Sequence, residues 1–228
     1  MLKYRDAAPH PYNLIFIDSE EINWYTDYTK IYEIDFLKFG TVIRGGDWDK
    51  RYLKKQRTEP RFAKTQISFE RHFNEGVPWE ETEIYDYALK NPDITPLYEP
   101  GENLNQRLKA IDELYWNIRN HGYKSQRELQ DRSHEVLSER RNRTIPEFAT
   151  PEGHEIGVAI TRNGEIAHFY GGNHRVHLAK VLQLDNIPVR VVIRHKKWQQ
   201  IRNEVAQSNV DEKINDKLLT HPDLQNLL

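Results

Sequence analysis

Hydrophobic and polar positions recur with two different periods along the chain, and together they predict an α+β fold. Residues 155–160 and 165–170 have the every-second-residue pattern of strands, and Asn163 with Gly164 between them is typical of a type I′ hairpin turn. Apolar residues three and four positions apart from Leu104 to Ile118 predict a core helix that ends at Gly122. We therefore expect a small mixed sheet with packed helices.

Shorter signals extend this assignment along the chain. Ser125 and Glu128 have the spacing of a capping box, and Thr82 precedes a short apolar repeat, so a helix is expected to begin at each place. The remaining expected strands are residues 11–18, 40–44 and 188–193, and the remaining expected helices are 174–184, 196–205 and short segments around Pro222.

Length and composition are those of a globular protein that buries a core. The chain has 228 residues, of which 37% are hydrophobic. We expect one domain over residues 1–195 with a helical, aromatic-rich insertion at about 44–102, and a helical extension over 196–228. Because no window approaches the roughly 20 apolar residues that cross a bilayer and the first residues lack an apolar signal core, a cytoplasmic protein without a membrane span is expected.

Cysteine content and charge narrow the chemistry. The chain has no cysteine, which excludes disulfides, thiolate metal sites and a cysteine nucleophile. A formal charge of −2 argues against a surface built for nonspecific nucleic-acid binding, although a local basic groove stays open. The charged run at 132–143 is interpreted as a solvated helix face rather than a nucleic-acid strip.

The clearest candidate site is a glycine loop before the helix expected at 174–184. Gly171 and Gly172 are followed by Asn173, His174 and Arg175. Backbone N–H groups at a helix start are unpaired and carry partial positive charge, so this sequence predicts an anion site, with phosphate as the expected anion. In the alternative reading Asn173 only caps the helix and Arg175 pairs with a surface acid such as Asp185.

Two further groups of side chains have alternative readings. Asp47, Trp48 and Asp49 follow two glycines, and they form either a tight turn around a packed tryptophan or a site of functional carboxylates. His174 and His177 have a spacing that can ligate a metal, but isolated histidines are more often satisfied structural groups.

These elements and motifs together resemble the ParB/sulfiredoxin-like superfamily. Residues 117–126, NIRNHGYKSQ, resemble the helix-Gly-Gln element before the family's central strands. Residues 171–189, GGNHRVHLAKVLQLDNIPV, resemble its phosphate-binding box followed by Ile-Pro-Val, and residues 11–24 resemble the opening strand and turn. The resemblance covers that strand and roughly residues 105–195, and it leaves out the insertion and the C-terminal extension.

The resemblance implies a nucleotide at the box, but members of the superfamily act differently on one scaffold. ParB binds CTP and DNA, sulfiredoxin uses ATP to repair a sulfinic acid, and a related free-serine kinase moves a phosphoryl group from ADP. Sulfiredoxin has its reactive cysteine where this chain has Asn173, so that activity is excluded. One arginine in the box and no helix-turn-helix after it argue against chromosome partition.

The box is nearest to the serine-kinase pattern Asp-Gly-His-His-Arg, with Gly172, His174 and Arg175 matching and Asn173 in place of the first histidine. A kinase needs a carboxylate for the acceptor hydroxyl and Mg²⁺ on the phosphates. The candidate residues are Asp47 and Asp49 as catalytic acids and magnesium ligands, His174 as a catalytic donor, Arg44 to neutralise charge, Glu20 or Glu21 as the alternative base, and Trp48 and Gln126 as further site residues.

The sequence therefore predicts a phosphotransferase that uses ATP, ADP or CTP and transfers a phosphoryl group to a hydroxyl of a small molecule or glycan. One alternative is a ParB-like nucleic-acid-binding protein or nuclease. The other is a nucleotide-binding regulatory module without catalysis.

Overall fold

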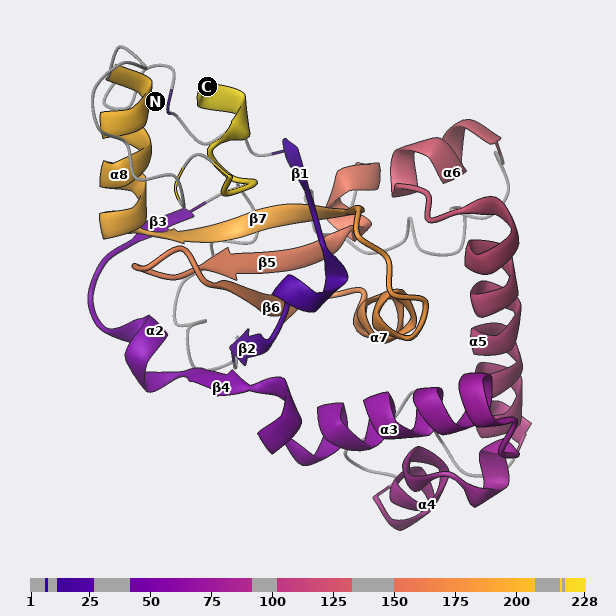
Figure 1. The fold of residues 1–228 in the computed structure, drawn as a ribbon. Coiled ribbons are helices and arrows are strands. Elements are labelled where there is room, and N and C mark those ends of the chain that lie inside the picture. The colour runs from indigo at the N-terminus through magenta and orange to yellow at the C-terminus, as the bar shows by residue number, and fades with distance from the viewer. Residues whose placement is uncertain are drawn as a thin grey trace.

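The computed structural model describes residues 7, 12–26, 42–91, 102–132, 150–207, 218 and 220–228 (Figure 1). Their centre is a mixed seven-stranded sheet in the order β1-β7-β5-β6-β2-β4, with β3 also paired to β7. Helices surround this sheet, which confirms the predicted α+β class. The strands are β1 Leu14–Ile17, β2 Trp24–Thr26, β3 Val42–Arg44, β4 Leu53–Lys55, β5 Ile156–Ile160, β6 Ile166–Tyr170 and β7 Ile187–His195.

The longest strand, β7, lies inside the sheet. It pairs in parallel with β5 along one edge, while β1 and β3 share the other edge, β1 antiparallel and β3 parallel. All nine residues of β7 are buried, because neighbouring strands cover both edges and packed elements cover both faces. The hairpin β5–β6 is antiparallel, as predicted, and β2 adds to β6 in parallel.

Seven α-helices occur in the described residues: α2 Trp48–Arg51, α3 Pro60–Glu75, α4 Glu83–Lys90, α5 Glu102–His121, α6 Gln126–Arg132, α7 Asn173–Val181 and α8 Lys196–Gln207. Short 3-10 turns are η2 Ser19–Glu21, η4 Gln56–Thr58, η5 Trp79–Glu81, η8 Pro151–His154 and η9 Gln225–Leu227. Within this described part, no helix combines the length and apolar character that crossing a membrane requires.

Several helix boundaries agree with the sequence signals. Helix α5 ends at His121, and Gly122 follows with a left-handed φ of 76°. Helix α6 begins with the predicted capping box, in which the Ser125 N–H donates to the Glu128 carboxylate at 2.8 Å and the Glu128 N–H donates to the Ser125 hydroxyl at 3.3 Å. Thr82 is the N-cap residue of α4, as expected.

Two local predictions are wrong. The segment 45–49 is not entirely loop, because helix α2 begins at Trp48. The β5–β6 connection is not a two-residue type I′ turn, since the strands end at Ile160 and Ile166 and, of Asn163 and Gly164, only Gly164 has a positive φ. A longer loop lets the turn of the chain occur with one left-handed residue instead of two.

The insertion is part of the main body. Its helices α3 and α4 share an apolar cluster with α5, and Leu178 of α7 belongs to the same cluster. A second cluster lies between the sheet and helices α7 and α8. Helix α7 therefore separates two cores, with the sheet on one side and α3 on the other (Figure 1).

Part of the sequence interpretation falls on residues outside the described ranges. These are Pro11, the apolar positions Val136 and Leu137, most of the charged run at 132–143 and residues 208–217. After them, the predicted helical turn near Pro222 is present as η9, and Leu224 is buried.

Candidate functional site

The glycine loop before α7 is shaped by close packing. Gly171 and Gly172 both have left-handed backbones, with φ of 67° and 61°. A Cβ on Gly172 would lie 2.6 Å from Cγ1 of Ile156, a fully buried residue. Gly172 is the N-cap residue of α7, and no side chain caps the helix, so Asn173 does not have the capping role of the alternative reading. The two glycines allow the chain to turn closely over β5.

Arg175 points back into the protein. Its Nη1 donates to the Glu155 carboxylate at 3.1 Å and to the Tyr123 hydroxyl at 3.3 Å, and its Nη2 donates to the carbonyl of His154. Burial raises the pKa of Glu155, an effect that Arg175 opposes. The partner of Arg175 is thus a buried glutamate and not Asp185, and Arg175 fixes the loop against β5 without extending toward a ligand.

His174 is neutral at the start of α7. Arg107 of α5 donates from Nη2 to its Nδ1 at 3.1 Å, so that nitrogen holds no proton. Burial, together with Arg107 and Arg61, lowers the pKa of His174 to about 3. The hollow beside it has a volume of about 30 Å³, close to the share of one water molecule in the liquid. The predicted phosphate box therefore offers little room at the helix end itself.

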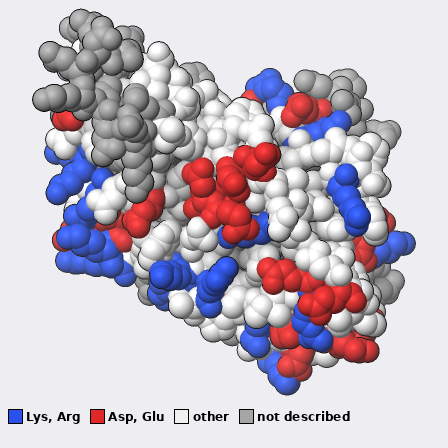
Figure 2. Space-filling model, viewed as in Figure 1, with Lys and Arg blue, Asp and Glu red and all other residues white. Residues whose placement is uncertain are grey.

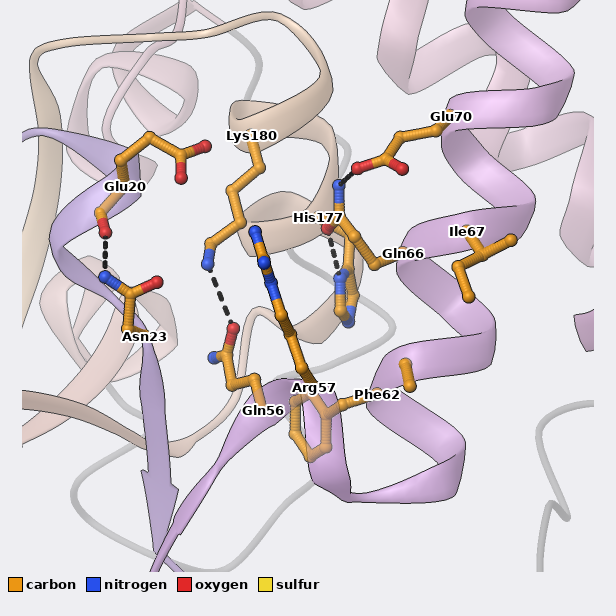
Figure 3. Close-up of a pocket in the computed structure, with 11 residues that line it drawn as sticks. Glu20, Asn23, Gln56, Arg57, Phe62, Gln66, Ile67, Glu70, His177 and Lys180 are labelled. Atoms are coloured by element: carbon orange, nitrogen blue, oxygen red, sulfur yellow. Dashed lines mark hydrogen bonds between the residues drawn. The ribbon is translucent and has the colours of Figure 1, made fainter.

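A larger pocket opens further along α7, between this helix and α3 (Figure 3). Its volume is about 320 Å³, within the range of small-molecule sites. It shares Phe62 and His177 with the small hollow, so the two cavities are neighbours on the same helix. Residues of η2 and η4, together with Asn23 just before β2, complete its walls.

Two cations converge in this α3–α7 pocket. Figure 3 shows Lys180 of α7 and Arg57 of η4 pointing into it from opposite sides. The Lys180 ammonium donates to the Ile22 carbonyl at 2.6 Å and to Gln56 Oε1 at 3.1 Å, which leaves one of its three N–H donors for the cavity. Burial lowers the pKa of Lys180 and Arg57 lowers it further, whereas Glu20 and Glu70 act in the opposite direction.

Polar side chains around these cations are held in order. Gln66 donates from Nε2 to Glu70 at 2.8 Å, which directs its Oε1 toward His177 Nδ1, also at 2.8 Å. His177 therefore donates from Nδ1, and its Nε2 is left as an acceptor. Burial keeps the pKa of His177 well below its usual value, so the ring is neutral. Glu20, predicted as an alternative base, lies at the same pocket beside Lys180.

Asp47 and Asp49 lie at the other end of the sheet. Arg162, in the β5–β6 loop, donates from Nη2 to Asp47 Oδ1 at 2.7 Å and to Asp49 Oδ1 at 2.6 Å, and from Nε to Asp49 Oδ2 at 2.8 Å. The β5–β6 loop and the glycine loop are joined by β6, whose five residues span about 13 Å at about 3.3 Å per residue. The expected approach of these acids to the glycine loop does not occur.

The contacts of Arg162 with Asp47 and Asp49 also bear on the predicted magnesium site. Burial acts to raise the pKa of Asp49, but its hydrogen bonds from Arg162 hold that pKa below its usual value. A carboxylate pair already bridged by a guanidinium is poorly suited to ligate a hard cation, so Asp47 and Asp49 do not fit the Mg²⁺ site assigned to them. Among the described residues, no cluster of three or more His, Asp or Glu side chains is arranged to hold a metal ion.

Three other predicted site residues lie either at the Asp49 end of the sheet, as Arg44 and Trp48 do, or beside Glu155, as Gln126 does. Arg44 accepts through its carbonyl from Nε1 of Trp48 at 3.3 Å, and both lie at the Asp49 end of the sheet, where His195 Nε2 bonds the Gly46 carbonyl at 2.9 Å. Gln126 contributes its backbone N–H, which donates to Glu155 at 2.5 Å.

The remaining predicted acid, Glu21, lies in the same η2 turn as Glu20 but does not line the α3–α7 pocket. Burial raises its pKa, and the neighbouring Asp18 adds to that effect.

Lys180 and Arg57 were not among the predicted site residues. Lys180 lies six positions after His174 on the same helix, and His177 lies between them, so this polar row on α7 was a usable signal. Arg57 had no comparable signal, because its side chain reaches α7 only through the packing of α3.

Comparison of the chain with protein-family models, with curated proteins and with solved structures finds no match in any of the three. The resemblance to the ParB/sulfiredoxin-like superfamily consequently stays an expectation from motifs.

Proposed function

We propose that the chain is a phosphotransferase that binds a nucleotide by its phosphates in the α3–α7 pocket. The observation that carries the proposal is the convergence of Lys180 and Arg57 in one cavity, where the charge of Arg57 adds to burial in lowering the pKa of Lys180. No carboxylate of the described residues forms an ion pair with Lys180. An anion placed between the two cations relieves their repulsion, and phosphate supplies both the charge and the acceptor oxygens.

The nucleotide and the reaction class come from the resemblance of residues 171–189 to a phosphate-binding box. In this proposal the phosphates lie beside the middle and last turn of that helix, at His177 and Lys180, and not at its first turn. The glycine loop and Arg175 then have an indirect role, since they fix the start of α7 against β5.

The pocket also holds a carboxylate for the acceptor. In the proposed reaction an acceptor hydroxyl oxygen forms a bond to the terminal phosphorus, and the bond from that phosphorus to the bridging oxygen of the nucleotide breaks. Glu20 takes the hydroxyl proton, and the shortened nucleotide leaves with the electron pair of the broken bond. Arg57 and Lys180 stabilise the charge on the phosphoryl oxygens. Small molecules and glycans with free hydroxyls are the acceptors that the sequence predicts.

Calorimetric titration with ATP, ADP and CTP, with and without magnesium, tests the binding step. Arg57→Gln and Lys180→Gln are each expected to weaken binding at least tenfold, because each removes a charged contact worth about 1.5–3 kcal/mol. Arg51→Gln is the matched control, since Arg51 is an exposed arginine outside the pocket lining, and it is expected to bind as wild type does. Circular dichroism of each variant confirms that it is folded.

Transfer is measured separately with a panel of hydroxyl acceptors. Glu20→Gln is expected to retain nucleotide binding within about twofold and to lose most of the transfer rate, as general-base catalysis contributes about 10²–10⁴-fold. Absence of nucleotide binding by the wild type, or full binding by both cation variants, would falsify the proposal. Nucleotide binding without transfer to any acceptor would instead support the regulatory module without catalysis.

A further inference from the structure

The surface beside the α3–α7 pocket carries a concentrated positive charge. Residues 50–64 contain seven basic side chains and one acidic side chain, a net charge of +6 in a chain whose formal charge is −2. We call this surface the cationic strip, and its members are Lys50, Arg51, Lys54, Lys55, Arg57, Arg61 and Lys64. Figure 2 shows blue side chains gathered at the left and lower left of the molecule, over α2 and β4.

Most of these charges are not neutralised by neighbours. Among the described residues, Lys50 is the one member with an ion pair, a 3.7 Å contact to Asp47 between two exposed side chains. The single acid of the segment, Glu59, is engaged elsewhere, because its carboxylate accepts from the Phe62 N–H at 2.7 Å and caps α3. Five of the seven cations are exposed to solvent, and Arg61 and Lys64 are partly buried.

The path of the backbone makes the strip linear. Helix α2, strand β4, turn η4 and the start of α3 follow one another directly, and β4 is the last strand of the described sheet beyond β2. Because successive side chains of a strand point to opposite faces, Lys54 and Lys55 flank the outer edge of β4 in the described sheet from its two faces, between the cations of α2 and η4. A linear polyanion with closely spaced charges matches this arrangement.

Aromatic rings lie next to the cations. Trp24 and Tyr25 on β2 pair in register with Lys55 and Lys54 on β4, and the Lys55 ammonium lies 5.6 Å from the centre of the Trp24 ring. Trp24 is partly exposed beside Lys55, whereas Tyr25 lies on the opposite face of β2 and packs its ring 4.9 Å from that of Phe62. A basic track with adjoining aromatic faces is the combination that binds single-stranded nucleic acids, where phosphates meet cations and bases stack on rings.

Lysines on an edge strand also protect it from pairing with another sheet, and that explanation covers part of the pattern. It accounts for Lys54 and Lys55 on the three-residue strand β4, which is too short to template much pairing. It does not account for Lys50 and Arg51 on α2 or for Arg57 and Arg61 beyond the strand. Moreover, the strip lies within residues 44–102, outside the part of the chain that carries the family resemblance.

We infer that the cationic strip binds single-stranded nucleic acid, with phosphates along α2, β4 and η4 and a base against Trp24. This surface is distinct from the α3–α7 pocket, which it meets at Arg57. A strand that contacts the five exposed cations from Lys50 to Arg57 would show a slope of log K against log salt of about −3.5, at about −0.7 per phosphate contact.

Fluorescence anisotropy with labelled single-stranded DNA and RNA oligonucleotides of mixed sequence, titrated with salt, tests the inference. Lys54→Gln with Lys55→Gln is expected to weaken binding on the order of tenfold or more at low salt and to reduce the size of the slope by about 1.4. Lys90→Gln with Lys109→Gln removes the same charge from exposed positions on α4 and α5, and it should bind as wild type does.

The inference is overturned if no oligonucleotide binds, or if the strip variant and the control variant bind equally well. It is also overturned if heparin of matched charge binds as tightly as the oligonucleotide and loses as much affinity in the strip variant. The surface would then recognise negative charge alone and not nucleic acid. ATP titration of the Lys54→Gln, Lys55→Gln protein separates the two proposals. That variant should lose oligonucleotide binding and still bind ATP within twofold of wild type. A wild-type protein that binds ATP but no oligonucleotide overturns this inference alone, whereas one that binds the oligonucleotide but no nucleotide overturns the proposed function alone.

Discussion

At the scale of single residues, Gly172 has two separate reasons to lack a side chain. Its φ of 61° is left-handed, and a Cβ would meet buried Ile156 at 2.6 Å. We expect Gly172→Ala to lower the free energy of unfolding by about 2–5 kcal/mol, the sum of the costs of a left-handed alanine and an overpacked core. Urea denaturation followed by circular dichroism measures the loss.

Gly122→Ala is the matched control for this change. Gly122 has a similar φ of 76°, but a Cβ there would meet nothing within 4 Å. Only the backbone cost of about 1–2 kcal/mol is expected at this position. Equal losses in the two variants would show that Ile156 does not constrain the glycine loop.

The same loop shows which site residues the sequence can predict. Gly171 and Gly172 were expected at a turn before a helix, and the structure has that turn. The role assigned to Arg175 depended on where its side chain points, and that is set by the buried carboxylate of Glu155, twenty positions earlier in the chain. Local sequence gives the helix start, whereas only the packing gives the direction of the guanidinium.

At the scale of elements, Asp49 joins α2 to the β5–β6 loop. Its carboxylate accepts from the Arg162 backbone N–H at 3.0 Å as well as from the guanidinium, and its side chain is 3% exposed. Asp49→Ala is expected to lower the free energy of unfolding by about 1.5–3 kcal/mol, the range for hydrogen bonds to a charged group. Thermal and urea unfolding measure the effect.

Asp47→Asn serves as the comparison, because the Asp47 side chain is half exposed and solvent screens its contact with Arg162. This variant should unfold close to wild type. A larger loss for Asp47→Asn than for Asp49→Ala would contradict the assignment of Asp49 as the anchoring carboxylate.

The long helix α3 is an element that the sequence analysis did not predict. Its signals are present, since Glu59 caps it, Pro60 is its first residue and Gly76 ends it with a φ of 74°. The sequence predicts a helical insertion at about 44–102, but the one helix start that it predicts there is near Thr82, and α3 itself was not predicted. Helices α5 and α6 were predicted because their apolar spacing and capping box are local. The pocket depends on α3 packing against α7, so it could not be predicted without α3.

At the scale of the whole molecule, a buried aspartate near the C-terminus ties the last residues to the sheet. Asp223 is fully buried, and Arg194 of β7 donates to it from Nη2 at 2.6 Å while Trp198 of α8 donates from Nε1 at 2.9 Å. Arg202 of α8 lies 3.4 Å from the same carboxylate. The C-terminal segment is thereby held against β7 and α8, which follow each other directly in the chain.

This cluster predicts how stability depends on pH. Burial acts to raise the pKa of Asp223, but Arg194 and Arg202 hold it below its ordinary value of 3.8. A carboxyl group with a lowered folded pKa stabilises the protein fully above its unfolded pKa, and that contribution is lost as the pH falls through the folded pKa. Wild-type stability should therefore drop below about pH 3.8, whereas Asp223→Asn should be less stable by about 3 kcal/mol at neutral pH and lose less on acidification.

Urea midpoints from pH 7 to pH 2 test this expectation for wild type, Asp223→Asn and the exposed control Asp185→Asn. Glu155 titrates in the opposite sense, because burial raises its folded pKa and its protonation on acidification favours the folded state until about pH 4.5. All three proteins retain Glu155, so the difference between the wild-type and Asp223→Asn curves isolates Asp223. A constant difference down to pH 2 would mean that the arginines do not stabilise the ionised form of Asp223. In that case the C-terminal segment would be held mainly by the burial of Leu224, and not by charge.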